Sequence, residues 1–261
     1  MKSPVSTLIL YFALLSAGCG SPARRMPVPS DAPMKMLWAW ERPEDLRFLD
    51  SRASGVAYLA QTLTLERETV RYAPRRQPLV LPEDNYLIAV TRIETQKLAE
   101  LRPSYSEEQI AEMARLVSDT LNRPNVRGVQ IDFDAVASER GFYKRFLERL
   151  RSELPPDFPL TMTALASWCL GDLWLNELPV DEAIPMVFEM GSDTQRVRAY
   201  LAKGNDWHDP LCTASYGVSV DEPPVEGLAP NRRIFYFKNT AWSSTDTRDL
   251  KWEPSGSDLP K

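Results

Sequence analysis

The stretch "VRGVQIDFDAV", residues 126–136, decides the fold class because it reads as a buried strand that carries polar residues at every second position. Side chains alternate between the two faces of a strand, so Gln130, Asp132 and Asp134 share one face and the apolar residues between them share the other. The sequence therefore predicts a strand with one apolar face and two carboxylates on the opposite face.

Helical patterns flank this strand on both sides. "SEEQIAEMARLVSDTLN" (106–122) precedes it and "SERGFYKRFLERLRSELP" (138–155) follows it, and each begins at a serine that can serve as an N-cap. Pro155 is expected to stop the second helix. A third pattern, "DTQRVRAYLAKG" (193–204), ends at Gly204 in the manner of a helix C-cap. Strands that alternate with helices predict a parallel sheet.

Apolar runs of strand length recur through the rest of the chain and bring the number of expected strands to eight. They cover residues 36–40, 55–65, 86–93, 128–135, 160–167, 183–190, 213–220 and 233–238. This pattern favours an α/β fold, a (β/α)8 TIM-like barrel. The barrel is expected to be slightly irregular, because residues 66–85 resemble an extended hairpin more than a helix. A doubly wound open sheet is the alternative, but no Gly-x-Gly-x-x-Gly follows any strand.

Three segments divide the chain. Residues 1–19 resemble a signal peptide, in which the apolar run "LILYFALL" leads to "SAGC", which resembles a lipobox and ends at Cys19. An ordinary cleaved signal peptide is the alternative. Residues 20–34 are rich in Pro, Ser and Gly and predict a flexible tether, and 35–261 predict the barrel domain. We expect an exported protein, lipidated at Cys19 and held at the periplasmic face of a bacterial membrane.

Composition excludes some classes of function. The chain has 261 residues, of which 43% are hydrophobic and 26% charged, as is usual for a globular domain with one large core. Its net charge of -5 arises from interspersed acids and bases without a basic block, so we expect no nucleic-acid partner. No motif predicts a cofactor, and the sequence does not fix the oligomeric state.

The cysteines and the histidine do not indicate a metal or catalytic site. In an oxidising compartment Cys169 and Cys212 can form a disulfide, and two separate buried thiols are the alternative. Neither cysteine has a second ligand at metal-binding spacing, so no metal site is expected. His208 is the single histidine of the chain, and its polar setting "GNDWHDP" predicts a surface loop.

The barrel gives the two aspartates a location. Polar side chains within a barrel are costly unless paired, whereas the carboxyl ends of barrel strands carry catalytic groups, so Asp132 and Asp134 are expected at the mouth. Residues two apart on a strand lie roughly 6.6 Å apart, so crowding by Asp132 should raise the pKa of Asp134. A carboxyl group that stays protonated near neutrality can serve as a general acid.

These residues resemble the chitinase-like glycoside hydrolases of family 18. The fourth barrel strand of that family carries Asp-Gly-x-Asp-x-Asp-x-Glu, whose final Glu protonates the glycosidic oxygen. In "RGVQIDFD", Gly128 and Asp132 match, Asp134 stands in place of that Glu, and Arg127 and Gln130 replace the first two acids. The resemblance thus implies a barrel that acts on a glycan, with Asp134 as acid and Asp132 or a third carboxylate as partner.

Other strands show weaker similarity to the same family. In "MVFEMG" (186–191), Phe188 replaces a Tyr and Glu189 an Asp, which makes Glu189 a further candidate for the catalytic partner. "LTMTALA" resembles the fifth strand, and Trp242 follows the eighth strand as the family's Trp does. Asp134 is shorter than Glu and Phe188 has no hydroxyl to bind an N-acetyl oxygen. Both substitutions argue against the substrate-assisted mechanism of chitinases.

A more specific resemblance brings no activity with it. The runs "QIDFDA" and "SERGFY", followed by "LTMTALASWCLGD" and "LPVDEAIPM", are similar to an uncharacterised bacterial family known only as a domain of unknown function. This similarity spans nearly the whole chain after the tether.

Aromatic residues give a second reason to expect a carbohydrate ligand. Trp40, Trp168 and Trp242 fall at or just beyond the carboxyl ends of three predicted strands, where their rings can stack on sugar faces. The alternative is that these rings fill the core. Arg92, followed by Glu94, can bind a hydroxyl or a carboxylate, and a salt bridge between the two is the alternative. The residues predicted to bind substrate are Trp40, Arg92, Gln130, Trp168 and Trp242.

Several functions remain open from the sequence. The first is an exported glycosidase with Asp134, Asp132 and Glu189 as its catalytic groups. The second is a barrel that has lost catalysis and binds carbohydrate, or a purely structural lipoprotein. A third treats "DFD" as a divalent-cation site, which ranks lowest because no other acid-rich loop completes the coordination. A structural role for the acids, in salt bridges to barrel arginines, is the remaining alternative.

Overall fold

The computed structural model describes residues 29, 31–171, 174–248 and 250. Eight parallel strands close into a barrel, because β1 pairs with β3 on one side and with β11 on the other. This confirms the predicted (β/α)8 class, and each predicted strand corresponds to one barrel strand. The strands are β1 (Lys35–Ala39), β3 (Ser54–Glu66), β6 (Leu87–Thr95), β7 (Val126–Asp132), β8 (Leu160–Leu165), β9 (Glu182–Met186), β10 (Ser215–Ser219) and β11 (Arg233–Phe237).

Side-chain alternation along the strands creates two apolar layers. The inward residues of the barrel form a small core of their own, which includes Trp38, Ile88, Ile184 and Phe235. The outward residues join the helices in a second and larger core. The period of two predicted for β7 is observed, since Gln130 lies inside the barrel while its apolar neighbours belong to the outer core.

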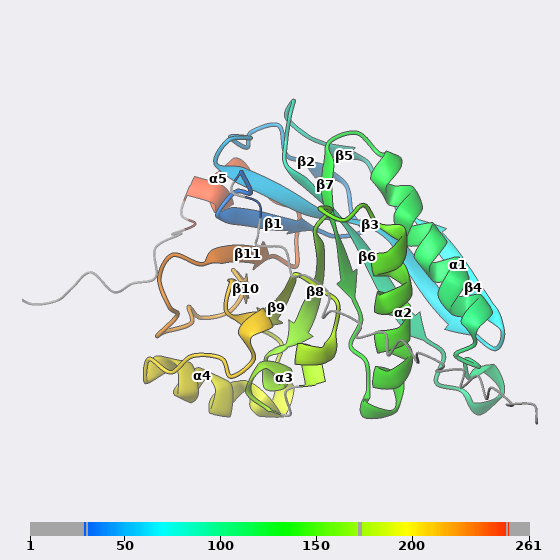
Figure 1. Ribbon diagram of the computed structural model, residues 1–261. Helices are drawn as coiled ribbons and strands as arrows, with labels where there is room; N and C mark the ends of the chain where they lie inside the picture. Colours follow the sequence, from blue (N-terminus) through cyan, green and yellow to red (C-terminus); the bar gives the residue numbers. More distant parts are fainter. Residues whose placement is uncertain (1–28, 30, 172–173, 249, 251–261) are drawn as a thin grey trace, which may run out of the picture.

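Helices cover the barrel unevenly. The helices α1 (Glu107–Ser118) and α2 (Arg140–Glu153) pack side by side on one flank of the barrel (Figure 1). The other helices are shorter: α3 (Ala166–Leu170), α4 (Thr194–Ala202) and α5 (Ser244–Arg248). Single turns of 3-10 helix complete the connections: η1 (Ala99–Leu101), η2 (Asp119–Asn122), η3 (Ala137–Glu139), η4 (Trp174–Glu177), η5 (Gly191–Asp193) and η6 (Pro210–Cys212).

The helix ends test the predicted caps. Ser106 caps α1 through a capping box with Gln109, as expected. Ser138 does not cap α2, because the turn η3 intervenes and the Glu139 carboxylate accepts the Val136 N–H instead. Helix α2 ends at Glu153, two residues before the predicted stop, and Gly204 follows α4 with a φ of +75°.

The predicted irregularity lies between the first three barrel strands. After β3 the chain turns back as β4 (Thr69–Pro74), which pairs with β3 in antiparallel fashion. The short strands β2 (Glu44–Asp45) and β5 (Leu79–Val80) form a small separate sheet. This confirms the expected hairpin, and neither β1–β3 nor β3–β6, both fully described, contains a helix.

A disulfide decides the question that the sequence left open for the two later cysteines. Cys169 at α3 and Cys212 at η6 are bonded, with their Cα atoms 5.9 Å apart. No helix in the described ranges is long and apolar enough to cross a membrane. The predicted signal segment 1–19, Cys19 and most of the tether 20–34 lie outside the described residues.

Candidate functional site

The carboxyl ends of the barrel strands enclose two adjoining hollows. A cavity of about 220 Å³ is lined on one side by aromatic rings, and we call it the aromatic hollow. A shallower one of about 310 Å³ is lined mainly by polar residues of β6 and the segment after it, and we call it the polar hollow. Arg92, Asp132 and Asp134 line both hollows. The predicted acids therefore lie at the junction of one cleft, at the mouth of the barrel.

Asp132 is the deeper of the two acids. It is the last residue of β7, and its carboxylate accepts a hydrogen bond of 2.8 Å from the Thr163 hydroxyl. Burial raises the pKa of the Asp132 carboxyl to about 6, helped by the charge of Asp134 and opposed by the Thr163 hydrogen bond and by Arg92. A carboxyl group with this pKa keeps a substantial protonated fraction in mildly acidic solution.

Asp134 lies just beyond the end of β7 and is exposed to the cleft. Its carboxylate makes no hydrogen bond to any described residue. Partial burial raises its pKa, and the charge of Arg92 opposes the rise. The predicted crowding is therefore present, but it acts on the other acid: the negative charge of Asp134 raises the pKa of Asp132, and the larger rise is at Asp132.

The segment that carries Asp134 is fixed by a buried glutamate. The Glu139 carboxylate accepts hydrogen bonds from the Val136 N–H, the Thr95 hydroxyl and the Tyr105 hydroxyl, at 2.8–2.9 Å, and from Lys97 at 3.2 Å. Burial alone would raise the pKa of Glu139, but these hydrogen bonds together outweigh burial and lower it. Glu139 thereby ties the segment after β7 to the segment after β6.

Gln130 supports the floor of the cleft and does not reach the ligand space. Its side chain is fully buried inside the barrel and accepts a 2.8 Å hydrogen bond from the Trp38 indole N–H. Gly217 on β10 makes room for the same ring, because a Cβ atom there would lie 2.7 Å from the Trp38 ring. The prediction that Gln130 contacts substrate is therefore corrected: it orients Trp38, which lines the aromatic hollow.

Aromatic rings from β1, β11 and the segment after β9 form one wall of the aromatic hollow. The rings of Phe188 and Phe237 are stacked, with centroids 5.1 Å apart, and Trp40 meets Phe237 edge-on at 6.2 Å. Trp40 is half-buried and reaches the cleft as expected. Sequence reasoning missed Trp38 and Phe237, although both continue the inward alternation of their strands and that period was the available signal.

Glu189 faces the aromatic hollow from a strained backbone position. Its φ is +49°, a left-handed conformation that glycine favours and glutamate seldom adopts. The Glu222 carboxylate accepts the Glu189 N–H at 2.7 Å and is itself paired with Arg198 at 3.0 Å. These contacts hold an exposed carboxylate on the cleft wall, two strands along the barrel from Asp134.

The structure does not bring Trp168 to the cleft. Strand β8 ends at Leu165, two residues before its predicted end, and the chain then turns into α3. Trp168 is only 5% exposed and packs edge-on against Trp174, with ring centroids 5.0 Å apart. The ring belongs to the outer core, as the alternative reading allowed.

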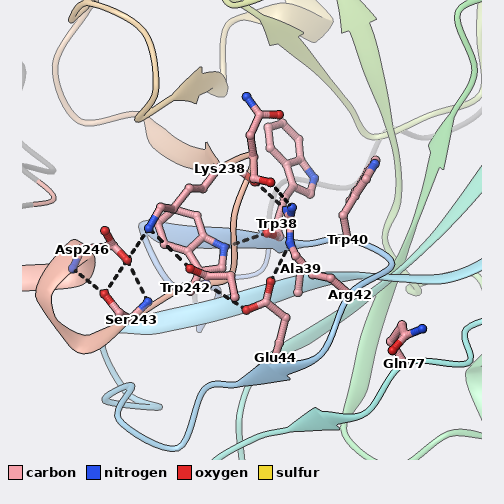
Figure 2. Close-up of polar contacts among 12 residues, drawn as sticks. Trp38, Ala39, Trp40, Arg42, Glu44, Gln77, Lys238, Trp242, Ser243 and Asp246 are labelled. Atoms are coloured by element: carbon pink, nitrogen blue, oxygen red, sulfur yellow. Dashed lines mark hydrogen bonds and ion pairs between the residues drawn. The ribbon is translucent and has the colours of Figure 1, made fainter.

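Trp242 also has a structural position. Its indole N–H donates to the Trp38 carbonyl and its backbone N–H donates to Glu44, both at 2.9 Å, as Figure 2 shows. Arg42 joins the same network through the carbonyls of Lys238 and Asn239. Trp242 thus fastens the segment after β11 to the segment after β1, and its predicted role in stacking on sugar is not supported.

Arg92 both lies at the cleft and forms the salt bridge with Glu94, the two alternatives that the sequence allowed. It lines the two hollows, and its guanidinium group forms an ion pair of 3.3 Å with Glu94. Within the described ranges, no three His, Cys, Asp or Glu side chains are grouped so that they can hold a metal ion.

Two comparisons with known proteins, one with a protein family and one with a solved structure, give a match. Residues 83–184 match the family described as "Domain of unknown function (DUF3142)", and this range includes both acids of β7 and its end. No curated protein matches the chain. The structure is similar to the chitinase domain of the spore coat protein CotE from Clostridium difficile, with 11% identity and a TM-score of 0.38 over 69% of this chain and 54% of that one. The chain spans about half the length of that domain structure.

Proposed function

We propose that the cleft is the active site of a glycoside hydrolase. The observation that carries the proposal is the position of two carboxyl groups with raised pKa values, Asp132 and Asp134, at the junction of the two hollows and opposite an aromatic wall. Glycoside hydrolysis needs an acid and a second carboxylate beside the scissile bond. Aromatic rings bind the apolar faces of sugars, and the aromatic wall offers such rings beside the two acids.

The positions of the acids support distinct roles for them. Asp134 is exposed and makes no hydrogen bond to the described protein, so its carboxyl group is available to protonate the glycosidic oxygen. Asp132, whose pKa is about 6, is electrostatically coupled to Asp134, so the pair holds a proton in mildly acidic solution that the exposed Asp134 can deliver. Glu189 completes the reaction, either by activating a water molecule or by attacking the anomeric carbon. A carboxyl separation of about 6.5–9.5 Å requires the first and about 5–5.5 Å the second.

Isosteric substitutions test these roles. Asp134→Asn keeps the shape and removes the acid, so turnover of a natural glycan should fall about a hundredfold or more while binding is retained. An activated aryl glycoside, whose leaving group needs little protonation, should lose less. Asp119→Asn is the matched control, because this exposed aspartate ends α1 and lies outside the cleft.

The same measurements separate the two functions that the cleft can serve. Equal turnover by the wild type and Asp134→Asn would refute the acid assignment. Glycan binding by both proteins with turnover by neither would replace the hydrolase by a carbohydrate-binding barrel that has lost catalysis.

We further propose that the protein is exported and anchored in a bacterial membrane through a lipid on Cys19. The signal-like segment supports this, and so does the Cys169–Cys212 disulfide, since such bonds persist in oxidising compartments. A palmitate analogue should label the wild type and leave Cys19→Ala unlabelled. A mature amino terminus other than Cys19 would contradict the proposal.

A further inference from the structure

The charges that line the cleft do not balance. The two hollows together contain more carboxylates than cations. The acids are Glu94, Asp132, Asp134, Glu189 and Asp193, and the cations are Arg92 and Lys97. A cleft whose walls carry one excess sign of charge concentrates ligands of the opposite sign.

Both cations are already engaged by carboxylates. Arg92 pairs with Glu94 at 3.3 Å, and Lys97 pairs at 3.2 Å with Glu139, whose side chain is only 3% exposed. The negative charge of each partner offsets the positive charge of its cation.

The acids divide into paired and unpaired groups. Asp193 is neutralised by Arg196 at 2.9 Å. For Asp132, Asp134 and Glu189, in contrast, no Lys, Arg or His nitrogen of the described protein lies within 4.0 Å. Three acids thus face the ligand space with no cation of the described residues at ion-pair distance, although the charge of Arg92 acts on Asp132 and Asp134 from farther away.

The position of Glu189 strengthens this point. Its left-handed backbone is held by a hydrogen bond to Glu222, and Arg198 is bound to Glu222, so the neighbouring cation is turned to that residue. Strained residues persist where the surrounding structure fixes them, commonly at ligand sites. The contacts around Glu189 present its acid to the cleft and leave it without a partner there.

We propose that the substrate of this cleft is a glycan with free amino groups, whose ammonium groups compensate the excess negative charge of the cleft walls while the sugar rings lie against the aromatic wall. The proposal rests on the glycan-binding function proposed above and names its substrate class. An ammonium group forms charge-assisted hydrogen bonds to carboxylates, and Trp40 offers it a cation–π contact. An N-acetylated chain has no such charge, and a uronic-acid chain brings like charges together.

A matched series of oligosaccharides tests the preference by calorimetry. The series contains a glucosamine tetramer, the same tetramer fully N-acetylated, and a uronic-acid tetramer, each titrated into the wild-type protein. The glucosamine tetramer should bind about tenfold or more tightly than the acetylated one, and the uronic-acid tetramer weakest of the three. Raising the salt from about 0.05 M to about 0.5 M should weaken binding of the amino tetramer alone, because salt screens exposed charges.

Two substitutions locate the effect. Glu189→Gln should lower the affinity for the amino tetramer about threefold to tenfold and leave that for the acetylated tetramer unchanged. Glu226→Gln, at an exposed glutamate outside both hollows, is the matched control and should alter neither affinity.

The outcomes separate this proposal from the function on which it rests. Equal or tighter binding of the acetylated or uronic-acid tetramer would overturn the amino-glycan preference and leave a glycan-binding cleft in place. Absence of binding by all three tetramers would overturn both. Loss of affinity for the amino and acetylated tetramers alike in Glu189→Gln would show that its charge does not select the substrate.

Discussion

The two ends of the barrel differ in whether their charged side chains form ion pairs. At the end where the strands begin, Glu182 of β9 and Arg233 of β11 form an ion pair whose side chains are 0% and 5% exposed. At the mouth, Asp132, Asp134 and Glu189 have no such partner among the described residues. Arg233 also lies over the ring of Phe235, a residue of the inner core, with its guanidinium carbon 5.2 Å from the ring centroid.

This contrast shows where charge serves stability and where it is available to a ligand. A buried ion pair is fixed by its own partners, and removal of one member leaves an uncompensated charge. Acids at an open mouth keep part of their hydration and can exchange water for substrate. The predictions below follow this difference, from the largest expected effect to the smallest.

Arg233→Met should have the largest effect on stability. The variant leaves the Glu182 carboxylate buried and unpaired, which should lower the free energy of unfolding by about 3–5 kcal/mol, measured by urea denaturation. The double variant Arg233→Met with Glu182→Leu should recover most of the loss, since both charges are then gone. Arg47→Met, which breaks an exposed ion pair with Asp45, is the control and should change stability little. If Arg233→Met lowers the free energy of unfolding no more than Arg47→Met does, the buried ion pair does not stabilise the protein as proposed.

Asp132→Asn should stabilise the protein at neutral pH while it lowers turnover. The folded pKa of about 6 lies above the ordinary 3.8, so the folded state binds more protons between these values and stability falls as pH rises through that window. Because the side chain is partly exposed, we expect the gain at neutral pH to be about 2 kcal/mol. Urea midpoints between about pH 4 and about pH 7 should decline in the wild type and not in the variant. Parallel pH profiles would contradict the burial of this charge.

Glu139→Gln should lower stability by about 1–2 kcal/mol, because a neutral amide replaces an acceptor of charge-assisted hydrogen bonds. Since the pKa of Glu139 is lowered, its contribution is present above the ordinary value of 4.5 and is lost as pH falls through the folded value. Thermal unfolding at neutral and acidic pH measures both effects. Glu112→Gln, at an exposed position on α1, is the control. If the two variants behave alike, Glu139 does not fix the segment that carries Asp134.

Glu189→Gly should have the smallest effect on stability. Unlike Arg233→Met, it should raise stability. Glycine adopts the left-handed conformation without strain, so the free energy of unfolding should rise by up to about 1 kcal/mol, while binding of an amino tetramer weakens. Glu189→Gln keeps the backbone strain and loses only the charge, so it should weaken binding with no gain in stability. If Glu189→Gly instead destabilises the protein, contacts of the Glu189 side chain stabilise the left-handed conformation, and the conformation is not a strain maintained for ligand binding.

Local pattern determined most of the fold. Strand alternation depends only on neighbouring residues, so the period of two in "VQIDFD" correctly placed Gln130 and Asp132 on the inner face of β7. The eight apolar runs and the helices between them likewise predicted the parallel barrel, and from it the location of the two acids at one mouth.

Contacts between distant segments decided the details of the site. Trp38 and Gln130 are 92 residues apart in the sequence, and Trp242 and Trp38 are 204 apart, yet these pairs share hydrogen bonds that set which rings reach the cleft. The early end of β8 turned Trp168 into the outer core, and folding brought Cys169 to Cys212.

The charge balance of the cleft could not be predicted from the sequence either, because it too depends on contacts between distant segments. The sequence left open whether Arg92 binds a ligand or pairs with Glu94, and the tertiary structure shows that Arg92 pairs with Glu94 and Lys97 with Glu139. The sequence determined which acids point into the barrel, because strand geometry is local. Tertiary packing decided which of them lack a partner, because burial and ion pairing depend on residues that only the fold brings together.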